Sequence, residues 1–458
     1  MRKNKEIAKD MTEGPVLKQL AAFAGPVALA NALQAVYSMV DMVVVGQFVG
    51  SGGLSAVGIG GQIMFVMLAF GMGFGVGAQV LLSQQVGAKD KDLQPTIGTL
   101  FTLELIGAVV IGLLGIVGCP LLLGLMNTPA EALPDATAYT IICSCGMLFI
   151  FGYNAVCAIL RGMGESKLPT IFIAVASVVN LVLDLVFVAG LHMSAAGAAL
   201  ATVIAQGISF VIAIVYLYKN RAQFGFDFKL RSFKPSPEHL KPIVKVGIPY
   251  IAQMLMITCS MMFVNAQVNK YGVVASAVDS IGNKLNSVVN IVIGAVAMAG
   301  ATMMGQCFGA RKLDRVKQVY RACTAVCMIS FVIVAAAYLL LPRQIFRLFS
   351  ADPDVIDMSP LYLRVGVVWV LSMATMTAPY TVIDGVGHAM LGLVISIADG
   401  VVARIGLCIL LGHFLGLPGY WLGNALAGFV TTIMAGAYYY SGRWKTRRLL
   451  LEKEQEPA

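Results

Sequence analysis

Two ten-residue segments of this chain, far apart in the sequence, resemble each other, which predicts that the chain folds as two related halves. Five residues of the segment that begins at Ser83 match the segment that begins at Gly305 at one offset: Gln84, Gly87, Ala88, Lys89 and Asp92 match Gln306, Gly309, Ala310, Arg311 and Asp314. Further landmarks repeat within a residue of the same spacing: Pro26 and Pro249, Ser55-Ala-Val57 and Ser276-Ala-Val278, and Gly162-x-Gly164 and Gly385-x-Gly387. A register kept over this length indicates internal duplication.

The composition places the duplicated chain in a membrane. Hydrophobic residues make up 58% of the 458 residues and charged residues only 12%. Apolar runs long enough to cross a bilayer follow one another along the chain, and the period-two alternation of a barrel is absent. We therefore predict an all-α integral membrane protein with twelve transmembrane helices in two pseudo-symmetric six-helix lobes. The predicted spans lie near 17–48, 54–82, 95–124, 137–160, 168–190, 195–218, 242–269, 274–304, 318–341, 360–384, 390–412 and 417–441.

Polarity along the chain predicts the lobe boundaries and the orientation. The polar stretch within 219–241 is taken as a cytoplasmic linker between an N-lobe, 1–218, and a C-lobe, 242–458. Because cytoplasmic loops hold the excess of Lys and Arg, both termini are expected in the cytoplasm and the protein in the inner membrane. The basic residues that set this orientation are Lys3, Lys5, Lys9, Lys89, Lys91, Arg161 and Lys167, and those within 219–245, 311–321 and 443–448.

Several classes of partner and chemistry are disfavoured. The net charge of +9 follows from the loop asymmetry, so we expect no nucleic-acid partner, and a monomer in the lipid bilayer. Cys323 and Cys327 share a helical face but have no His or carboxylate beside them, which argues against a metal site. The motifs His-Glu-x-x-His and Gly-x-Gly-Asp of intramembrane hydrolases and the nucleotide-binding Gly-x-x-x-x-Gly-Lys-Ser/Thr do not occur. We expect no enzyme activity and no cofactor.

Two acids distinguish the halves. Asp41 and Asp184 lie in apolar stretches whose counterparts in the second half are Val264 and Leu407. Counted along their spans, Asp41, Asp184 and Thr202 each lie about 10 Å below the outer surface, so they can meet in one layer. Asn180 is one helical turn from Asp184 on the same face and adds an amide. Such an oxygen-rich set suits a monovalent cation or a proton shared between acids. The alternative is that the acids are unrelated, each bonded to a neighbouring helix.

The other charged residues within the predicted spans can each be interpreted in more than one way. Neutral pairs of Lys284 or Arg404 with Asp279, Asp384 or Asp399 would serve structure or a gate as readily as transport. Glu104 has no basic partner within its span, so it is either protonated or turned toward a polar interior.

Matched prolines predict bending in matched helices. Pro26 and Pro249 lie about nine residues from the starts of the first and seventh spans. A proline inside a helix removes one hydrogen bond and bends it. We expect Pro26 to act as a hinge, although prolines are also common in membrane helices.

Taken together, these residues resemble those of the multidrug and toxic compound extrusion (MATE) transporters, over nearly the whole chain. The resemblance rests on two six-helix lobes, Gly-Ala-Lys/Arg after spans two and eight, Pro26 and Asp41 in span one, and Arg161-Gly-x-Gly164 after span four. Within the family the chain is similar to the prokaryotic DinF-like branch, whose first-lobe cation site maps onto Asp41, Asn180, Asp184 and Thr202. The acids that the NorM-like branch carries in spans seven and ten are replaced here by Ile257 and its apolar neighbours and by Leu371 to Thr375.

The resemblance implies a secondary active antiporter. It would export amphipathic, often cationic, small-molecule drugs or metabolites in exchange for H⁺ or Na⁺, with no metal beyond sodium at the cation site. A lipid-linked saccharide flippase of the same superfamily is the alternative. Five polar side chains could contact substrate in the first lobe, although ordinary helix packing explains each equally well: Asn31, Gln34, Tyr37, Tyr139 and Asn154.

Overall fold

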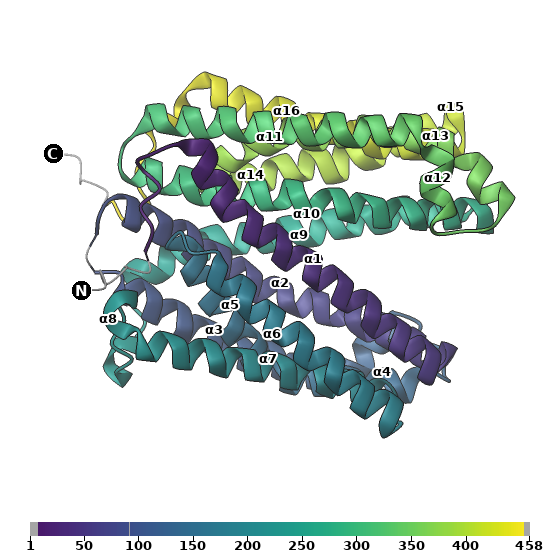
Figure 1. The fold of residues 1–458 in the computed structure, drawn as a ribbon, viewed down its shortest axis with the longest axis horizontal. Coiled ribbons are helices and arrows are strands. Elements are labelled where there is room, and N and C mark those ends of the chain that lie inside the picture. Colours follow the sequence, from purple (N-terminus) through teal and green to yellow (C-terminus); the bar gives the residue numbers. More distant parts are fainter. Residues whose placement is uncertain (1–7, 91, 453–458) are drawn as a thin grey trace. The chain divides into compact units, whose positions relative to one another are not determined.

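The structure, a computed structural model, describes residues 8–90 and 92–452 and is built from helices (Figure 1). Among the described residues no strand occurs. The helices of the first half are α1 (Val16–Phe48), α2 (Ser51–Gly87), α3 (Gln94–Leu125), α4 (Leu133–Cys145), α5 (Met147–Gly162), α6 (Lys167–Asp184), η1 (Leu185–Gly190), α7 (Ser194–Lys219), α8 (Arg221–Phe224) and η2 (Leu230–Phe233). Those of the second half are α9 (Pro237–Asn269), α10 (Val273–Gly309), α11 (Leu313–Leu340), α12 (Pro342–Arg347), α13 (Pro353–Gly385), α14 (Ala389–Ser396), η3 (Ile397–Ile405), α15 (Gly406–Leu415), α16 (Leu417–Ser441) and η4 (Arg443–Thr446).

These helices confirm the predicted all-α membrane class. Ten of the described helices are long and apolar enough to cross a membrane, and α4 with α5, bent by 52° at Gly146, makes an eleventh span. The predicted span near 417–441 forms α16, a helix of 25 residues. Lys3, Lys5 and Lys91, on which the predicted orientation partly depends, lie outside the described residues.

The chain divides into two compact units whose bounds differ from the predicted lobes. Unit 1 contains Met1–Asp10 and Leu29–Ile248, and unit 2 contains Met11–Ala28 and Pro249–Ala458. The stretch 219–241 therefore belongs to unit 1, because it is bonded to α3: Gln94 donates to the Ser232 hydroxyl at 3.0 Å, and the backbone nitrogen of Ser236 donates to Thr99 Oγ1 at 3.0 Å.

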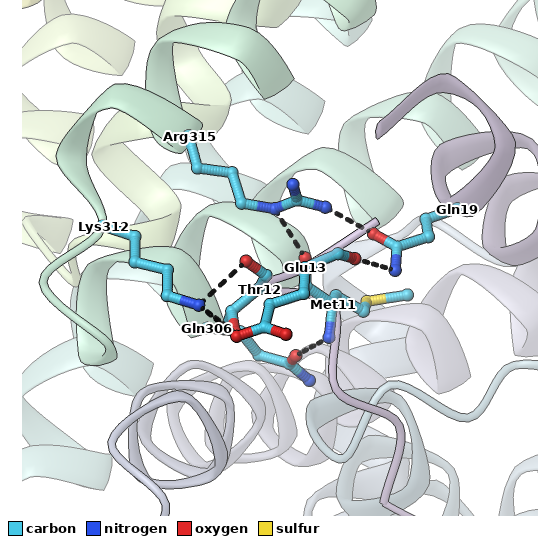
Figure 2. A network of polar contacts seen from close by, with 7 residues as sticks. All are labelled: Met11, Thr12, Glu13, Gln19, Gln306, Lys312 and Arg315. Carbon is cyan, nitrogen blue, oxygen red and sulfur yellow. Dashed lines mark hydrogen bonds and ion pairs between the residues drawn. The ribbon is translucent and has the colours of Figure 1, made fainter. Parts of the chain in front are cut away.

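The segment before α1 is held by polar contacts to unit 2 (Figure 2). The backbone nitrogen of Met11 donates to Gln306 Oε1 at 2.9 Å, and Arg315 Nε donates to the Met11 carbonyl at 3.0 Å. Lys312 Nζ forms an ion pair with Glu13 Oε1 at 2.8 Å. Gln306 and Lys312 both belong to the repeated segment identified in the sequence, so the second copy of that segment anchors the residues before α1.

The first turns of α1 continue this attachment with apolar packing. Leu20, Phe23 and Val27 are buried in the core cluster of unit 2, together with Val268 and Met303. The rest of α1, from Leu29 onward, belongs to unit 1. The change of unit falls close to Pro26 in α1 and directly before Pro249 in α9. The role of Pro26 as a hinge stays a prediction.

The duplication is visible in the backbone itself. Helices α1 and α9 both have 33 residues, and α2 and α10 both have 37. The residues before α2 and α10, Gly50 and Gly272, have φ values of 85° and 96°. Two non-glycine residues just after these helices also match, since Lys89 has φ 57° and Arg311 has φ 56°. A bulky residue with positive φ is uncommon, so its recurrence at matched positions shows that both copies adopt one local fold.

The repeated Gly-x-Gly motif serves two purposes in each unit. A Cβ on Gly162 would lie 2.9 Å from the Gln79 carbonyl oxygen of α2, and a Cβ on Gly385 would lie 3.0 Å from the Ala301 carbonyl oxygen of α10. The first glycine thus permits close approach of two helices. The second glycine supplies a positive φ, 83° at Gly164 and 70° at Gly387, which ends the helix.

We expect Gly162→Ala to destabilise the protein. The added methyl has to displace the backbone of α2, a form of overpacking that costs about 1–3 kcal/mol. Thermal unfolding of the purified protein in detergent measures the loss. Gly436→Ala is the control, because a Cβ there meets nothing within 4 Å and alanine favours the helix. Equal melting temperatures for the two variants would contradict the close-approach explanation.

Candidate cation-binding site

Three helices of unit 1 bring the predicted acids together. Asp41 lies on α1, Asp184 is the last residue of α6, and Thr202 lies on α7. Asn180 lies one turn before Asp184 on α6, as the four-residue spacing predicts. Asn180, Asp184 and Thr202 are 2%, 1% and 8% exposed, whereas Asp41 is half-buried.

The amide of Asn180 connects two members of the group. With its nitrogen facing the carboxylate, Asn180 donates to Asp184 Oδ2 at 2.7 Å, and its oxygen accepts from the backbone nitrogen of Thr202 at 3.1 Å. The opposite orientation places the amide nitrogen 3.3 Å from the Thr202 hydroxyl and turns its oxygen toward other acceptors. The first orientation satisfies both ends of the amide and is therefore the orientation of the Asn180 side chain.

The two carboxyl groups lie within hydrogen-bonding reach of each other. Two ionised carboxylates cannot bond directly, because both are acceptors and their charges repel. Oδ1 of Asp41 and Oδ1 of Asp184 are buried and receive no hydrogen bond from any described residue. Close approach of two carboxyl groups is favourable when one of them is protonated or when a small cation lies between them.

The backbone changes its winding at the site. Helix α6 ends at Asp184, and the next six residues, Leu185–Gly190, form the π-helix η1. A π-turn hydrogen-bonds over five residues instead of four, which widens the helix and changes the direction in which later side chains project. The carboxylate therefore sits at the junction of two helical geometries.

Two of the five proposed substrate contacts lie beside the acids. Tyr37 Oη is 3.4 Å from Thr202 Oγ1. Tyr139 is buried near Tyr37 and Asp41, and its ring occupies the space left by the missing side chain of Gly60. Asn31, Gln34 and Asn154 also lie in unit 1, but no hydrogen bond joins their side chains to this group among the contacts of the described residues. The role of all five in binding substrate stays a prediction.

Unit 2 contains a different polar group. Arg404 Nη2 lies 3.1 Å from Asp399 Oδ1, and Thr431 donates to Asp399 Oδ2 at 2.8 Å. Of the pairings that the sequence left open, the structure has Arg404 with Asp399. Lys284 is exposed, and Asp279 instead accepts from Asn283 at 3.1 Å.

Sequence reasoning missed Thr431 and the reason for the Asp399–Arg404 pair. Residues five apart point in different directions on an α-helix, but Ile397–Ile405 forms the π-helix η3, in which a five-residue spacing nearly closes one turn. The signal available in the sequence was the five-residue spacing of two opposite charges in an apolar run.

The fold and its buried acids define a multi-pass membrane protein of the transporter class, and known proteins identify the family. The MatE family model matches residues 26–186 and 249–410, two segments that begin at the paired prolines. The chain is 32% identical over 452 residues to the probable multidrug resistance protein YpnP of Bacillus subtilis (strain 168), covering 97% of this chain and all of that protein (100%). It therefore belongs to the MatE family, whose members are MATE transporters.

More distant relatives agree with this family. The multidrug export protein MepA of Staphylococcus aureus (strain MSSA476) is 24% identical over 425 residues, which cover 92% of this chain and 90% of that protein. A solved structure described as the outward-facing conformation of a multidrug resistance MATE family transporter of the MOP superfamily has a TM-score of 0.87. It is 23% identical and covers 95% of this chain and 97% of that chain, a likeness that concerns the fold.

Proposed function

We propose that this transporter is a cation-coupled antiporter that exports amphipathic, often cationic, organic compounds in exchange for H⁺ or Na⁺. The observation that carries the proposal is the meeting of Asp41 with Asp184 in unit 1, beside Asn180 and Thr202. The names of the relatives, which refer to multidrug resistance and export, support the substrate class.

The orientation of Asn180 bears on the coupling ion. Its amide oxygen accepts from the backbone nitrogen of Thr202 and its nitrogen points to Asp184, so the side of the amide that faces the carboxylate presents N–H groups and not an oxygen. This arrangement suits a proton shared between the two acids. Sodium would require the amide to rotate so that its oxygen joins the carboxylates and the Thr202 hydroxyl.

The ion gradient is sufficient for drug export. One charge moving down a potential of 100 mV supplies about 2.3 kcal/mol. At about 1.4 kcal/mol per decade, that energy supports a gradient of roughly fifty-fold for a neutral substrate. Binding of the external cation to Asp41 and Asp184 would displace substrate, so the two ligands would compete rather than occupy the site together.

The topology proposed for this activity follows from the loop charges. The ends that carry Lys89 and Arg311 would face the cytoplasm, together with both termini, in the inner membrane. We propose that the protein works as a monomer, with the lipid bilayer and its small-molecule substrates as partners.

Dye efflux from proteoliposomes tests the proposal. Purified protein is reconstituted, loaded vesicles are given a pH gradient, a sodium gradient or neither, and dye movement is followed by fluorescence. Efflux should depend on one of the two gradients and stop when it is dissipated. Equal efflux with no gradient would contradict antiport, and movement of a lipid-linked saccharide instead of dye would favour the flippase alternative.

We expect the cation to move helices of unit 1. Because the ligating groups lie on α1, α6 and α7, binding must draw these helices together. Spin labels placed on the part of α1 after Leu29 and on α6 should report a shorter distance after external acid or sodium is added. The same labels should not respond in Asp41→Asn. A response confined to α9 and α10 would contradict the assignment of the site to unit 1.

A further inference from the structure

Glu104 is a buried acid that the proposed cation site does not use. It lies on α3, is 1% exposed, and faces α2 and α5 within unit 1. Neither of its carboxyl oxygens receives a hydrogen bond or an ion pair from any described residue. A charged side chain at membrane depth costs several kcal/mol unless it is paired, so the state of this group needs an explanation.

The surroundings of Glu104 are shaped around its carboxyl group. A Cβ on Gly71 of α2 would lie 3.2 Å from Oε2, and a Cβ on Gly75, one turn further along, would lie 4.0 Å from Oε1. The same two positions are bordered by Phe151 and Ala158 of α5, at 3.1 Å and 3.3 Å. Two glycines thus make room for the carboxyl group, and the residues of α5 beside these glycines are apolar.

The chemistry of this niche selects its ligand. A sodium ion needs several oxygen ligands, and glycine, phenylalanine and alanine side chains provide none. Helix α2 has no titratable residue between Ser51 and Gly87. The titratable residues of the other elements packed against α3 are Asp135, Tyr139, Cys143 and Cys145 of α4, Tyr153, Cys157 and Arg161 of α5, and Arg231 of η2. Glu104 forms no hydrogen bond or ion pair with any of these residues. A proton is the one ligand that neutralises the acid in this space.

We propose that Glu104 is a second proton-binding site of unit 1, separate from the Asp41–Asp184 pair. In the packed state described here it is the neutral acid. When α2, α3 and α5 separate enough to admit water, its O–H bond breaks, the proton passes to a water molecule, and the carboxylate becomes hydrated. The inference rests on the proposed function in one respect, because it assigns the second site to a transporter that exchanges protons.

The level along α2 at which Glu104 packs suggests at which step of the transport cycle it would carry a proton. The Tyr139 ring packs at Gly60 of α2, near Asp41, whereas Glu104 packs at Gly71. Eleven residues of helix separate these levels, about 16 Å. Gly71 is closer than Gly60 to Lys89, at the end proposed to face the cytoplasm. A proton on Glu104 therefore lies between the outer acids and the cytoplasm, where a site for its release is needed.

Infrared spectroscopy tests the protonation state directly. The wild-type protein in lipid nanodiscs, with and without isotope-labelled glutamate, is measured at neutral pH in the absence of substrate. A buried protonated carboxyl gives a C=O stretching band that is separate from carboxylate bands. We expect such a band to shift with glutamate labelling and to be absent from Glu104→Gln. The absence of a label-sensitive band from the wild type would overturn the proposal, and this readout requires no variant to fold.

The matched control is Asp41→Asn, which should keep the glutamate band because it changes only the outer site. In proteoliposomes, Glu104→Gln should reduce the number of protons exchanged per dye molecule, while its dye binding stays pH-dependent through Asp41 and Asp184. A normal proton count in Glu104→Gln, with efflux lost in Asp41→Asn, would refute the second site and leave the proposed antiporter intact. Efflux by the wild type that depends on neither the proton gradient nor the sodium gradient would refute the antiporter itself.

Discussion

Replacing Asp41 or Asp184 by asparagine is expected to abolish cation-driven efflux without reducing the amount of folded protein. Asparagine keeps the volume and polarity of the side chain but removes the charge that attracts the cation. A coupling free energy of about 1–3 kcal/mol, roughly 5- to 150-fold in affinity, would then disappear. Dye efflux under a fixed gradient measures the loss, and gel filtration of the purified variants confirms their folding.

Asp279→Asn provides the control for both substitutions. Asp279 is a nearly buried acid of unit 2 that accepts a hydrogen bond from Asn283, so its replacement tests whether any membrane acid would give the same result. We expect its efflux to stay near that of the wild type. Full loss in Asp279→Asn, combined with near-normal efflux in Asp41→Asn, would move the coupling site to unit 2.

Arg404→Met is expected to cause a large loss of stability. The substitution leaves Asp399 buried with a single hydrogen bond, from Thr431, and without its counter-charge. Removing one partner of a buried ion pair typically costs about 3–5 kcal/mol, because the remaining charge is uncompensated. Thermal unfolding in detergent should show the decrease. The double variant Arg404→Met/Asp399→Asn should recover most of it, since no buried charge remains.

An exposed ion pair provides the control that distinguishes the loss of a buried ion pair from the loss of any positive charge. Arg343 lies 3.2 Å from Asp357, and both side chains are largely exposed. Such pairs contribute about 0–1 kcal/mol, so Arg343→Met should barely change the unfolding temperature. If Arg404→Met behaves like Arg343→Met, the buried pair contributes nothing to the stability of unit 2.

The features that could be predicted from the sequence are those with a local or periodic signature. The length of the apolar runs predicted a membrane protein, and the repeated segments predicted an internal duplication. The matched φ values of Lys89 and Arg311 agree with that duplication. Asn180 and Asp184 could be placed together because a four-residue spacing fixes their relation on one helix. Asp41 required an additional argument from depth, and the structure places it beside Asp184.

Features that depend on non-α winding or on distant packing could not be predicted. The pairing of Asp399 with Arg404 follows from the π-helix η3, which no simple periodicity reveals. The assignment of Met11–Ala28 to unit 2 depends on contacts with residues almost 300 positions later, such as Gln306. Dividing the chain at its most polar stretch cannot reveal that a segment early in the sequence packs in the unit formed by the later residues.

The attachment of Met11–Ala28 to unit 2 has a consequence for biosynthesis. Ribosomes make these residues before α9 and α10, so Leu20, Phe23 and Val27 find the rest of their core only after α10 has been made. Domains usually fold in the order of their synthesis, which this arrangement prevents. The first turns of α1 must therefore stay partly unpacked while the part of unit 1 from Leu29 to Ile248 is translated. Unit 2 is therefore completed by a segment that is translated before most of unit 1, and residues 249–452 alone do not contain the whole core of unit 2.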